Sequence, residues 1–269
     1  MRIFALSDLH VDYDANMQWV RGVSRFDHVD DMLILAGDIS HRLSLVDASL
    51  GVLARCFRMV LFVPGNHDLW VMDGAPGMDS LAKFEAVMKV AADCGVHTGT
   101  VSFGGWQVVP LLGWYDGTFG QPVEELRQVW LVFHACRWPA HLGLAGVAEH
   151  FTRLNEVLVR QDGTFGRQDG ATPDGAAGRR ITVSHFLPRV DLVPDFVPAR
   201  YRTLTPVLGS TRLERQLRQV GPTIHVYGHS HINQSVMLDG VRYVNNALGY
   251  PQEKRITTRQ LLCIADASA

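Results

Sequence analysis

Five short polar clusters in the sequence contain side chains that can bind metal ions. Each follows an apolar run, and together they hold aspartates, an asparagine and histidines: Asp8-Leu9-His10, Gly37-Asp38, Gly65-Asn66-His67-Asp68, Ser184-His185 and Gly228-His229-Ser230-His231. Oxygen donors and imidazoles without a thiolate are the ligand set of divalent first-row metals such as Mn, Fe, Zn, Ni or Co. The clusters therefore predict a site for two divalent metal ions.

The spacing within the clusters indicates how two ions would share these ligands. An Asp-x-His pair after a strand sends both side chains toward one side of the loop, and His-x-His places two imidazoles where they can serve neighbouring ions. The lone Asp38 can bridge both ions with one carboxylate. A glycine precedes Asp38, Asn66 and His229, as a tight turn requires where the backbone comes close to a site.

Apolar runs that alternate with helical patterns predict the elements that position these clusters. The runs that end at clusters are residues 2–6, 32–36, 59–63, 181–184 and 223–227. Alternation with helices, such as the one expected at 46–57, is typical of βαβ units and a parallel sheet, in which ligands bind at the carboxyl ends of the strands. Further helices are expected at 79–94, 143–160 and 210–220, and further strands in a hairpin at 100–112, at 235–238 and 241–244 around Asp239-Gly240, and at 260–265.

The composition is that of a folded protein without a global basic field. The 269 residues are 47% hydrophobic and 19% charged, with a formal net charge of −2, which excludes a disordered chain and argues against nucleic acid or an anionic membrane as the partner. No apolar run approaches the ~18 residues of a membrane span, and the N-terminus lacks a signal-peptide pattern. The four cysteines are widely spaced, as expected of free thiols. We therefore expect a cytoplasmic protein; its oligomeric state is not indicated.

The ordered set of clusters resembles the calcineurin-like metallophosphoesterase superfamily. The pattern of that family is D-x-H, G-D, G-N-H-[DE], a solitary H and G-H-x-H, and every element of it is present in order between residues 8 and 231. The resemblance implies an α/β fold: a four-layer αββα sandwich of two mixed β-sheets flanked by helices, with the metal site at the carboxyl ends of the strands.

The resemblance also implies a role for each residue of the clusters. One ion goes to Asp8, His10 and His231, the other to Asn66, His185 and His229, and Asp38 bridges them. His67 is expected near the phosphoryl oxygen or leaving group, with Asp68 holding its ring. The solitary histidine is the least clearly marked: His185 follows an apolar strand in the right order, and its rivals are His134, His141, His150 and His225.

This ligand set predicts metal-dependent hydrolysis of a phosphate ester. Two metals roughly 3.5–4 Å apart share a bridging water and lower its pKa, so that a metal-bridging hydroxide attacks phosphorus, and His67 protonates the leaving alcohol or stabilises its charge. We expect a small phosphorylated organic substrate, either a monoester or a diester. The alternatives are a nuclease or cyclic-nucleotide phosphodiesterase, a phosphoprotein phosphatase and, outside enzymes, a metal-free scaffold of the same fold.

One metallophosphoesterase domain is expected over residues 1–269, with a cap insertion around 113–160 and a flexible loop around 161–180. The stretch 113–139 contains six aromatic residues and is either a packed cap or a lid over an organic leaving group. The polar candidates for substrate binding are Tyr115, Asp116, Arg137 and Arg189, with Arg200 and Arg202 as further phosphate partners and Asn245, Asn246 and Tyr250 at the mouth of the site.

Overall fold

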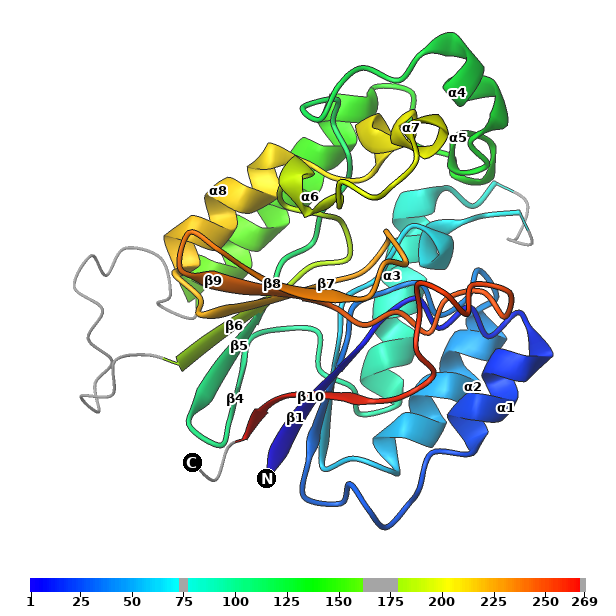
Figure 1. Cartoon of the computed structure of the whole chain (residues 1–269). Helices are drawn as coiled ribbons and strands as arrows, with labels where there is room; N and C mark the ends of the chain where they lie inside the picture. The colour runs from blue at the N-terminus through cyan, green and yellow to red at the C-terminus, as the bar shows by residue number, and fades with distance from the viewer. Residues whose placement is uncertain (73–76, 162–178, 267–269) are drawn as a thin grey trace.

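Two β-sheets pack face to face in the centre of the molecule (Figure 1). The computed structural model describes residues 1–72, 77–161 and 179–266. The four-stranded sheet has the order β10 (Leu262–Asp266), β1 (Arg2–Leu6), β2 (Met32–Leu35), β3 (Met59–Phe62). The six-stranded sheet has the order β4 (Val101–Phe103), β5 (Trp106–Pro110), β6 (Arg179–Val183), β7 (Ile224–Tyr227), β9 (Val241–Asn245), β8 (Gln234–Leu238).

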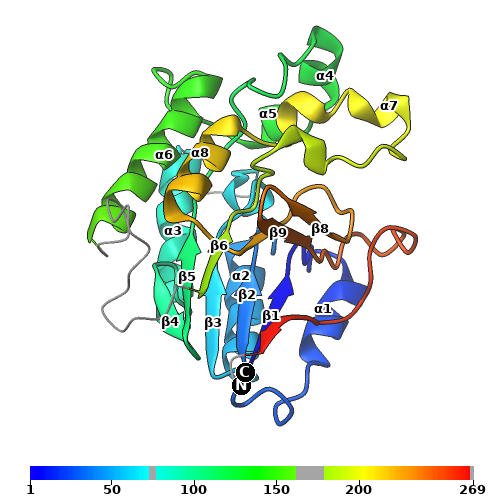
Figure 2. The same ribbon diagram turned by 60° about the vertical axis from the view of Figure 1, so that its left-hand side comes forward.

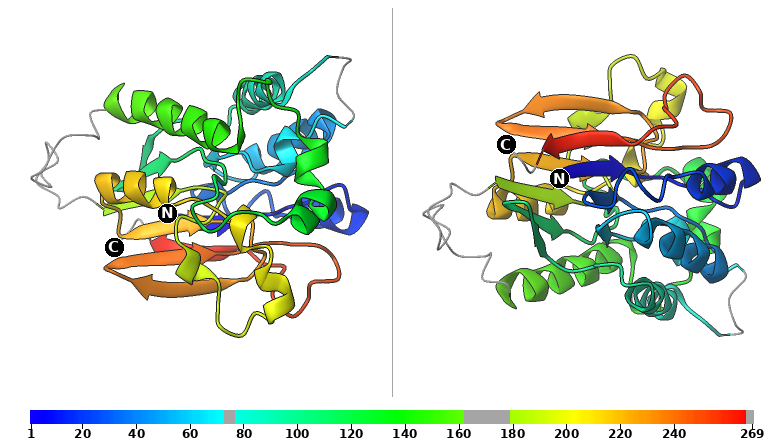
Figure 3. Two further views of the ribbon diagram at one scale, coloured as in Figure 1. Left: turned by 90° about the horizontal axis from the view of Figure 1, so that it is seen from above. Right: turned by 90° about the horizontal axis from the view of Figure 1, so that it is seen from below.

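Both sheets are mixed, and helices cover their outer faces (Figure 2, Figure 3). Strands β10, β4 and β8 run antiparallel to their neighbours, whereas the other pairings are parallel. Helices α1 (Asp14–Arg21), α2 (Leu43–Ala54) and α3 (Ser80–Asp93) flank the four-stranded sheet, and α6 (Leu144–Gln161) and α8 (Thr211–Val220) flank the six-stranded sheet. The predicted four-layer αββα sandwich is confirmed.

The central strands are buried on both faces, which explains their continuous apolar sequences. All four residues of β2 and of β7 are buried, as are residues 3–6 of β1. One apolar core joins the two sheets, and a second joins the four-stranded sheet to α1, α2 and α3. Each aliphatic side chain removed from water in this way contributes roughly 1.5–3 kcal/mol, so the polar residues that follow these strands start from rigid supports.

Several local signals in the sequence correspond to observed boundaries. Asp79 caps α3 by accepting a hydrogen bond from the N–H of Ala82, and Ser210 caps α8 by accepting one from the N–H of Arg212. Gly221 ends α8 with φ 66°, and the β8–β9 turn has positive φ at Asp239 and Gly240. Such caps and turns are the usual ends of helices and hairpins, and the helices expected at 79–94 and 210–220 agree with α3 and α8 to within one residue.

Short elements cover the edge of the sandwich where the parallel strands end. These are η1 (His67–Leu69), α4 (Glu124–Val129), α5 (Val132–Ala135), η2 (Val190–Leu192), α7 (Ala199–Arg202) and η3 (Thr205–Val207). Figure 1 shows α4, α5 and α7 close together at this end. The loop expected around 161–180 lies almost entirely outside the described residues. Within the described part of the chain, no helix combines the length and apolar character of a membrane span.

Candidate metal centre

The loops after five parallel strands bring the predicted metal ligands to one place between the sheets. Four of these residues follow β1, β2 or β3 of the four-stranded sheet: Asp8, His10, Asp38 and Asn66. The other three follow β6 or β7 of the six-stranded sheet: His185, His229 and His231. All seven are at least 91% buried, since their exposed fractions run from 0% for Asp8 to 9% for His229 and His231.

The backbone of these loops adopts an unusual conformation. Among the described residues, six that are not glycine have positive φ, and five of the six are predicted ligands: Asp8, His10, Asp38, His229 and His231. A positive φ is disfavoured for side chains with a Cβ, although Asp and His adopt it more readily than most. Such strain concentrates at functional sites, and here it turns each loop sharply after its strand.

Two glycines allow the loops to approach one another. A Cβ on Gly37, whose φ is 84°, would lie 2.5 Å from Nδ1 of His185. A Cβ on Gly65 would overlap with the carboxylate of Asp38 and the ring of His185. The prediction that glycine is needed where the backbone comes close to the site is confirmed at both positions.

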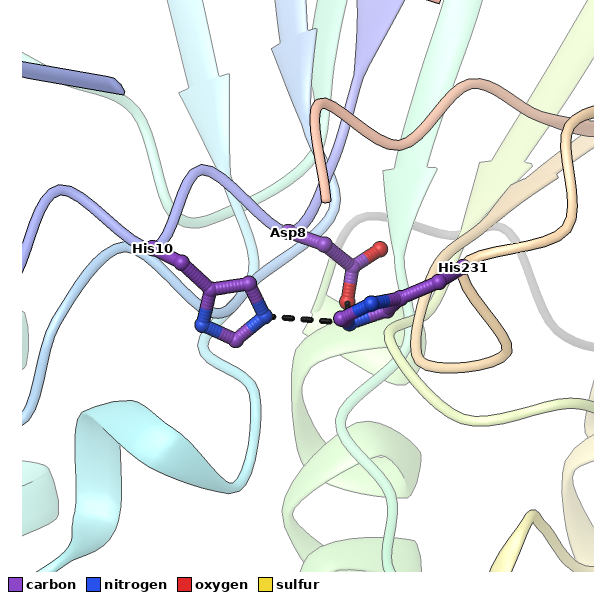
Figure 4. Close-up of side chains that lie close together, drawn as sticks. All are labelled: Asp8, His10 and His231. Atoms are coloured by element: carbon purple, nitrogen blue, oxygen red, sulfur yellow. Dashed lines mark hydrogen bonds and ion pairs between the residues drawn. The ribbon is translucent and has the colours of Figure 1, made fainter. Parts of the chain in front are cut away.

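The first group of donor atoms is formed by Asp8, His10 and His231 (Figure 4). Nε2 of His10 lies 3.0 Å from Nε2 of His231, which lies 3.3 Å from Oδ1 of Asp8. Two imidazole nitrogens and a carboxylate oxygen directed at one point, all of them buried, are a donor set that suits a divalent first-row cation.

The second group is formed by Asn66, His185 and His229. Nε2 of His185 lies 3.1 Å from Oδ1 of Asn66 and 3.2 Å from Nδ1 of His229. Oδ2 of Asp38 lies between the two groups, 3.5 Å from Nε2 of His185 and 4.0 Å from Nε2 of His10. One carboxylate oxygen is thus within reach of both donor sets.

Hydrogen bonds on the far side of three rings orient the imidazoles toward the centre. Nδ1 of His185 donates to the carbonyl of Ala36 at 2.8 Å, and Nε2 of His229 donates to the carbonyl of Val207 at 3.0 Å. Nδ1 of His231 donates to Oε2 of Glu253 at 2.7 Å. Because the far nitrogen of each ring carries the donated proton, the inner nitrogen offers a lone pair once the ring is neutral, which is the usual arrangement at metal-binding histidines.

Burial and the neighbouring charges set the protonation of the site. Burial, together with the neighbouring His185, lowers the pKa of His229 to about 3, so this ring is neutral, as a metal ligand must be. Burial opposes the charge on His231, but Asp8 and Glu253 raise its pKa to about 10. Burial and the nearby carboxylates of Asp68 and Asp8 raise the pKa of Asp38 well above its ordinary value. The carboxylates therefore favour positive charge at this centre.

His67 lies beside the two donor groups. Its Nε2 is 3.9 Å from Oδ2 of Asp38, and its ring stacks on Trp70 with centroids 3.8 Å apart. Burial and the nearby His231 lower its pKa well below the ordinary value. Because His10, Asp38 and His67 also place donor atoms close together, distance alone would admit His67 as a ligand, and its role as a catalytic residue stays a prediction.

Asp68 does not hold the ring of His67, which corrects one detail of the sequence interpretation. Its Oδ1 accepts the backbone N–H groups of Ile39 and Ser40, and its Oδ2 accepts those of Asp38 and Gly65. The η1 turn directs this carboxylate at the backbone, where it joins the loops after β2 and β3. Despite these four bonds, burial raises the pKa of Asp68 to about 6.

The four predicted substrate-binding residues lie elsewhere. Tyr115 is 1% exposed and packs against Trp114, Phe133 and Phe186. Asp116 accepts hydrogen bonds from Thr118 and Ser210 and pairs with Arg212, while Arg189 pairs with Asp191, Glu214 and Asp239. Arg137 is exposed, and its backbone N–H donates to Ser80. Tyr115 therefore serves packing, Asp116 and Arg189 form ion pairs, and none of the four residues is among those that line the cavity over the centre.

The contacts of four further candidate residues show whether each lies in the core or at the site. His225 is wholly buried, with its ring nitrogens 2.8 Å from the hydroxyl of Thr182 and 3.1 Å from that of Ser184, which agrees with the expectation of a core residue. Asn245 and Asn246 are buried and donate to the carbonyls of Gly228 and Ala5. Tyr250, by contrast, lies over the site, with its ring 4.5 Å from that of His10.

A cavity of about 230 Å³ opens over the two donor groups. Its polar floor includes Asp38, Asn66, His67, His229 and His231, and its walls are largely apolar. Several contributors were not found from the sequence, among them Trp130, Tyr201 and Glu253. No local pattern marks them, because they come from loops and short helices that only the tertiary fold brings to the site.

A comparison with known protein families identifies the family of this chain. Residues 1–233 match the calcineurin-like phosphoesterase family. The chain belongs to this family. It is therefore a phosphoester hydrolase, as the motifs predicted, and the use of divalent metals by the family agrees with the donor atoms gathered here.

Two comparisons concern one protein of Mycobacterium tuberculosis. A relative named acyl-carrier-protein phosphodiesterase PptH is 26% identical over 270 residues, which cover 94% of this chain and 79% of the relative. The crystal structure of phosphopantetheinyl hydrolase (PptH) from this organism has a TM-score of 0.78 at 22% identity and covers 98% of this chain and 95% of that chain. The structural similarity supports the two-sheet fold over the residues that the structure describes.

Proposed function

We propose that this phosphoesterase hydrolyses a phosphodiester with the help of two divalent cations. Asp8, His10 and His231 would hold one cation, Asn66, His185 and His229 the other, and Asp38 would contact both. The observation that carries the proposal is the position of Oδ2 of Asp38, within 4.0 Å of Nε2 of His10 on one side and 3.5 Å of Nε2 of His185 on the other.

The residues of the chain prepare this centre for an anionic substrate. When bound, two cations of this kind supply an activated water and offset the charge of the phosphoryl group. Oδ1 of Asp38 accepts the N–H of His67 at 2.8 Å, so Oδ2 is left for the donor groups. The Nε2 of His67 faces the same space, from which it can donate a proton or hydrogen bond to the leaving oxygen.

Two observations favour a diester as the substrate. No lysine or arginine is among the described residues that line the cavity, so no side chain of permanent positive charge is provided there for the second negative charge of a monoester. The Mycobacterium tuberculosis relative is named as a phosphodiesterase acting on acyl carrier protein and as a phosphopantetheinyl hydrolase. We therefore propose a protein-linked substrate, the diester that joins a phosphopantetheinyl group to a carrier protein, in place of a purely small substrate.

The remaining expectations belong to the same proposal. The chain forms one metallophosphoesterase domain that acts in the cytoplasm, and within the cap insertion expected around 113–160 it is the α4–α5 segment that covers the metal centre. Support for the cap comes from Trp130, which lies between these helices and lines the cavity.

The test is hydrolysis by metal-stripped protein to which Mn, Fe, Zn or Mg is returned. We expect turnover of bis-p-nitrophenyl phosphate to exceed that of p-nitrophenyl phosphate. We also expect release of the phosphopantetheinyl group from a holo carrier protein, which mass spectrometry of the carrier protein measures. Absence of hydrolysis with every metal would contradict the proposal, and a preference for the monoester would contradict the diester assignment.

A further inference from the structure

Two recesses flank the metal centre and differ in chemistry. The first, of about 230 Å³, we call the apolar recess; its walls are Trp130, Val193, Val197, Tyr201, Leu204, Leu208 and Ile232. The second, of about 260 Å³, we call the histidine recess; it is lined by His10, Asp12, Tyr13, His41, His67, Trp70, Leu131 and Tyr250.

The walls of the apolar recess come mostly from one segment. Residues 193–208, which include α7 and η3, supply five of its seven wall residues, and Trp130 and Ile232 supply the other two. Leu208 and Leu204 pack against the main core, so this wall is anchored. An uncharged substituent of the substrate fits such a surface, because burying a charge without a partner costs free energy.

The histidine recess offers hydrogen-bonding groups instead. Nδ1 of His41 lies 3.2 Å from Oδ1 of Asp12, which also accepts a hydrogen bond from the hydroxyl of Ser40 at 2.8 Å. Tyr13 is 43% exposed at its edge. These groups suit a polar arm that continues toward solvent.

The two recesses meet over the metal centre. His67 and Tyr250 line both of them. The consecutive residues Trp130 and Leu131, between α4 and α5, face one recess each. A phosphoryl group at the centre would therefore have one open path to each side.

From this arrangement we infer that the site is built for a diester with two unlike arms. The uncharged, largely apolar arm occupies the apolar recess, and the other arm leaves through the histidine recess. This inference rests on the proposed diester hydrolysis and adds an orientation to it. It makes Tyr201, 51% exposed at the mouth of the apolar recess, a specificity-determining residue.

The test measures binding, so that it does not depend on turnover. Manganese-loaded protein is titrated calorimetrically with the monomethyl esters of hexylphosphonic acid, methylphosphonic acid and 5-carboxypentylphosphonic acid. Each methylene buried adds roughly fourfold in affinity, so we expect the hexyl compound to bind at least tenfold more tightly than the methyl compound. The carboxylate-ended chain should lose this gain.

A matched pair of variants tests whether the alkyl chain of the ligand binds in the apolar recess. Tyr201→Glu places a charge at the apolar recess and should bring the hexyl-to-methyl affinity ratio close to one. Phe196→Glu is the control, because Phe196 is 70% exposed in the same segment and does not line the recess; the ratio should persist in this variant.

Two results would overturn the inference: equal affinity of the wild-type protein for the hexyl and methyl compounds, or an undiminished ratio in Tyr201→Glu. Hydrolysis of bis-p-nitrophenyl phosphate alongside either result would leave the proposed function standing. Hexyl-selective binding without hydrolysis would contradict the proposed function but not the assignment of the apolar arm to the apolar recess.

Discussion

At the scale of single residues, orientation of the imidazoles matters as much as their presence. Glu253 contributes to the first donor group without reaching its centre, since its Oε2 accepts from Nδ1 of His231 and from the N–H of Tyr250, each at 2.7 Å. The carboxylate fixes the ring and increases the basicity of Nε2. Its effect should therefore appear in metal affinity.

We expect Glu253→Ala to weaken manganese binding by roughly 10–100-fold. Glu253→Gln should recover part of this loss, because an amide oxygen still accepts from the ring. Calorimetric titration with Mn²⁺ measures both. The control is Glu149→Ala, at a half-buried position on α6 where Glu149 pairs with Arg153, and equal affinities for Glu253→Ala and this control would refute the orienting role.

His67→Ala should retain both cations and lose activity. The ring lines both recesses, and removal of a positioned acid typically costs about 10²–10⁴-fold in rate. Metal content and the kcat for bis-p-nitrophenyl phosphate are measured on the same preparation. Loss of metal together with rate would instead make His67 a ligand.

At the scale of the elements, the loops after the strands set the geometry of the centre. Gly65→Ala would force a Cβ against Asp38 and His185, so we expect lower metal occupancy and at least a tenfold loss of activity. Gly99→Ala is the control, because a Cβ there meets nothing within 4 Å. Equal metal content in the two variants would show that the close approach at Gly65 is dispensable.

The adjacent strands β6 and β7 carry a pH-dependent contribution to stability. Burial lowers the pKa of His225 to about 3 from its ordinary 6.5. The unfolded chain therefore takes up this proton at a higher pH than the folded chain, and the contribution present above pH 6.5 is lost as the pH falls toward 3. At pH 5 the loss from this residue is roughly 2 kcal/mol.

His225→Gln should therefore lose less stability than the wild-type protein between pH 7 and pH 5. Urea unfolding in the presence of a chelator measures the difference at each pH. The exposed His141 provides the comparison, since His141→Gln should keep the wild-type pH dependence. A pH dependence unchanged by His225→Gln would exclude the buried imidazole as its source.

Local sequence signals predicted the strands that carry the site. They did not predict the features that depend on contacts between residues far apart in the sequence. Apolar runs such as 32–36 identify strands because both faces are buried. Helix α1 went unpredicted, and its N-cap Tyr13 makes no side-chain capping bond. The pairing of β10 with β1 joins Arg2 to Asp266 across the whole chain, and nothing local indicates it.

The same distinction holds within the site. The seven convergent side chains could be predicted because each follows a strand in a fixed motif. Tyr250 was expected at the mouth of the site, whereas Glu253, from the same segment between β9 and β10, belongs to no comparable motif and was not predicted. Asp68 could be located, but its partners depend on how the η1 turn directs the carboxylate toward the backbone N–H groups of Asp38 and Gly65.

At the scale of the whole molecule, the centre joins the two sheets. Asp8, His10, Asp38 and Asn66 belong to loops of the four-stranded sheet, whereas the three remaining histidines belong to the six-stranded sheet. Neither sheet contributes a complete donor group, because His231 completes the first and Asn66 completes the second. The chemistry therefore depends on the packing of the full sandwich.

The most direct test of this account is the number of cations bound per chain in wild-type protein and in Asp38→Ala. Equilibrium dialysis against Mn²⁺, with metal content determined by mass spectrometry, should give two ions per wild-type chain. The variant should hold at most one and should lose turnover of bis-p-nitrophenyl phosphate, while circular dichroism shows an intact fold. Two ions and wild-type turnover in Asp38→Ala would contradict a centre built around that carboxylate.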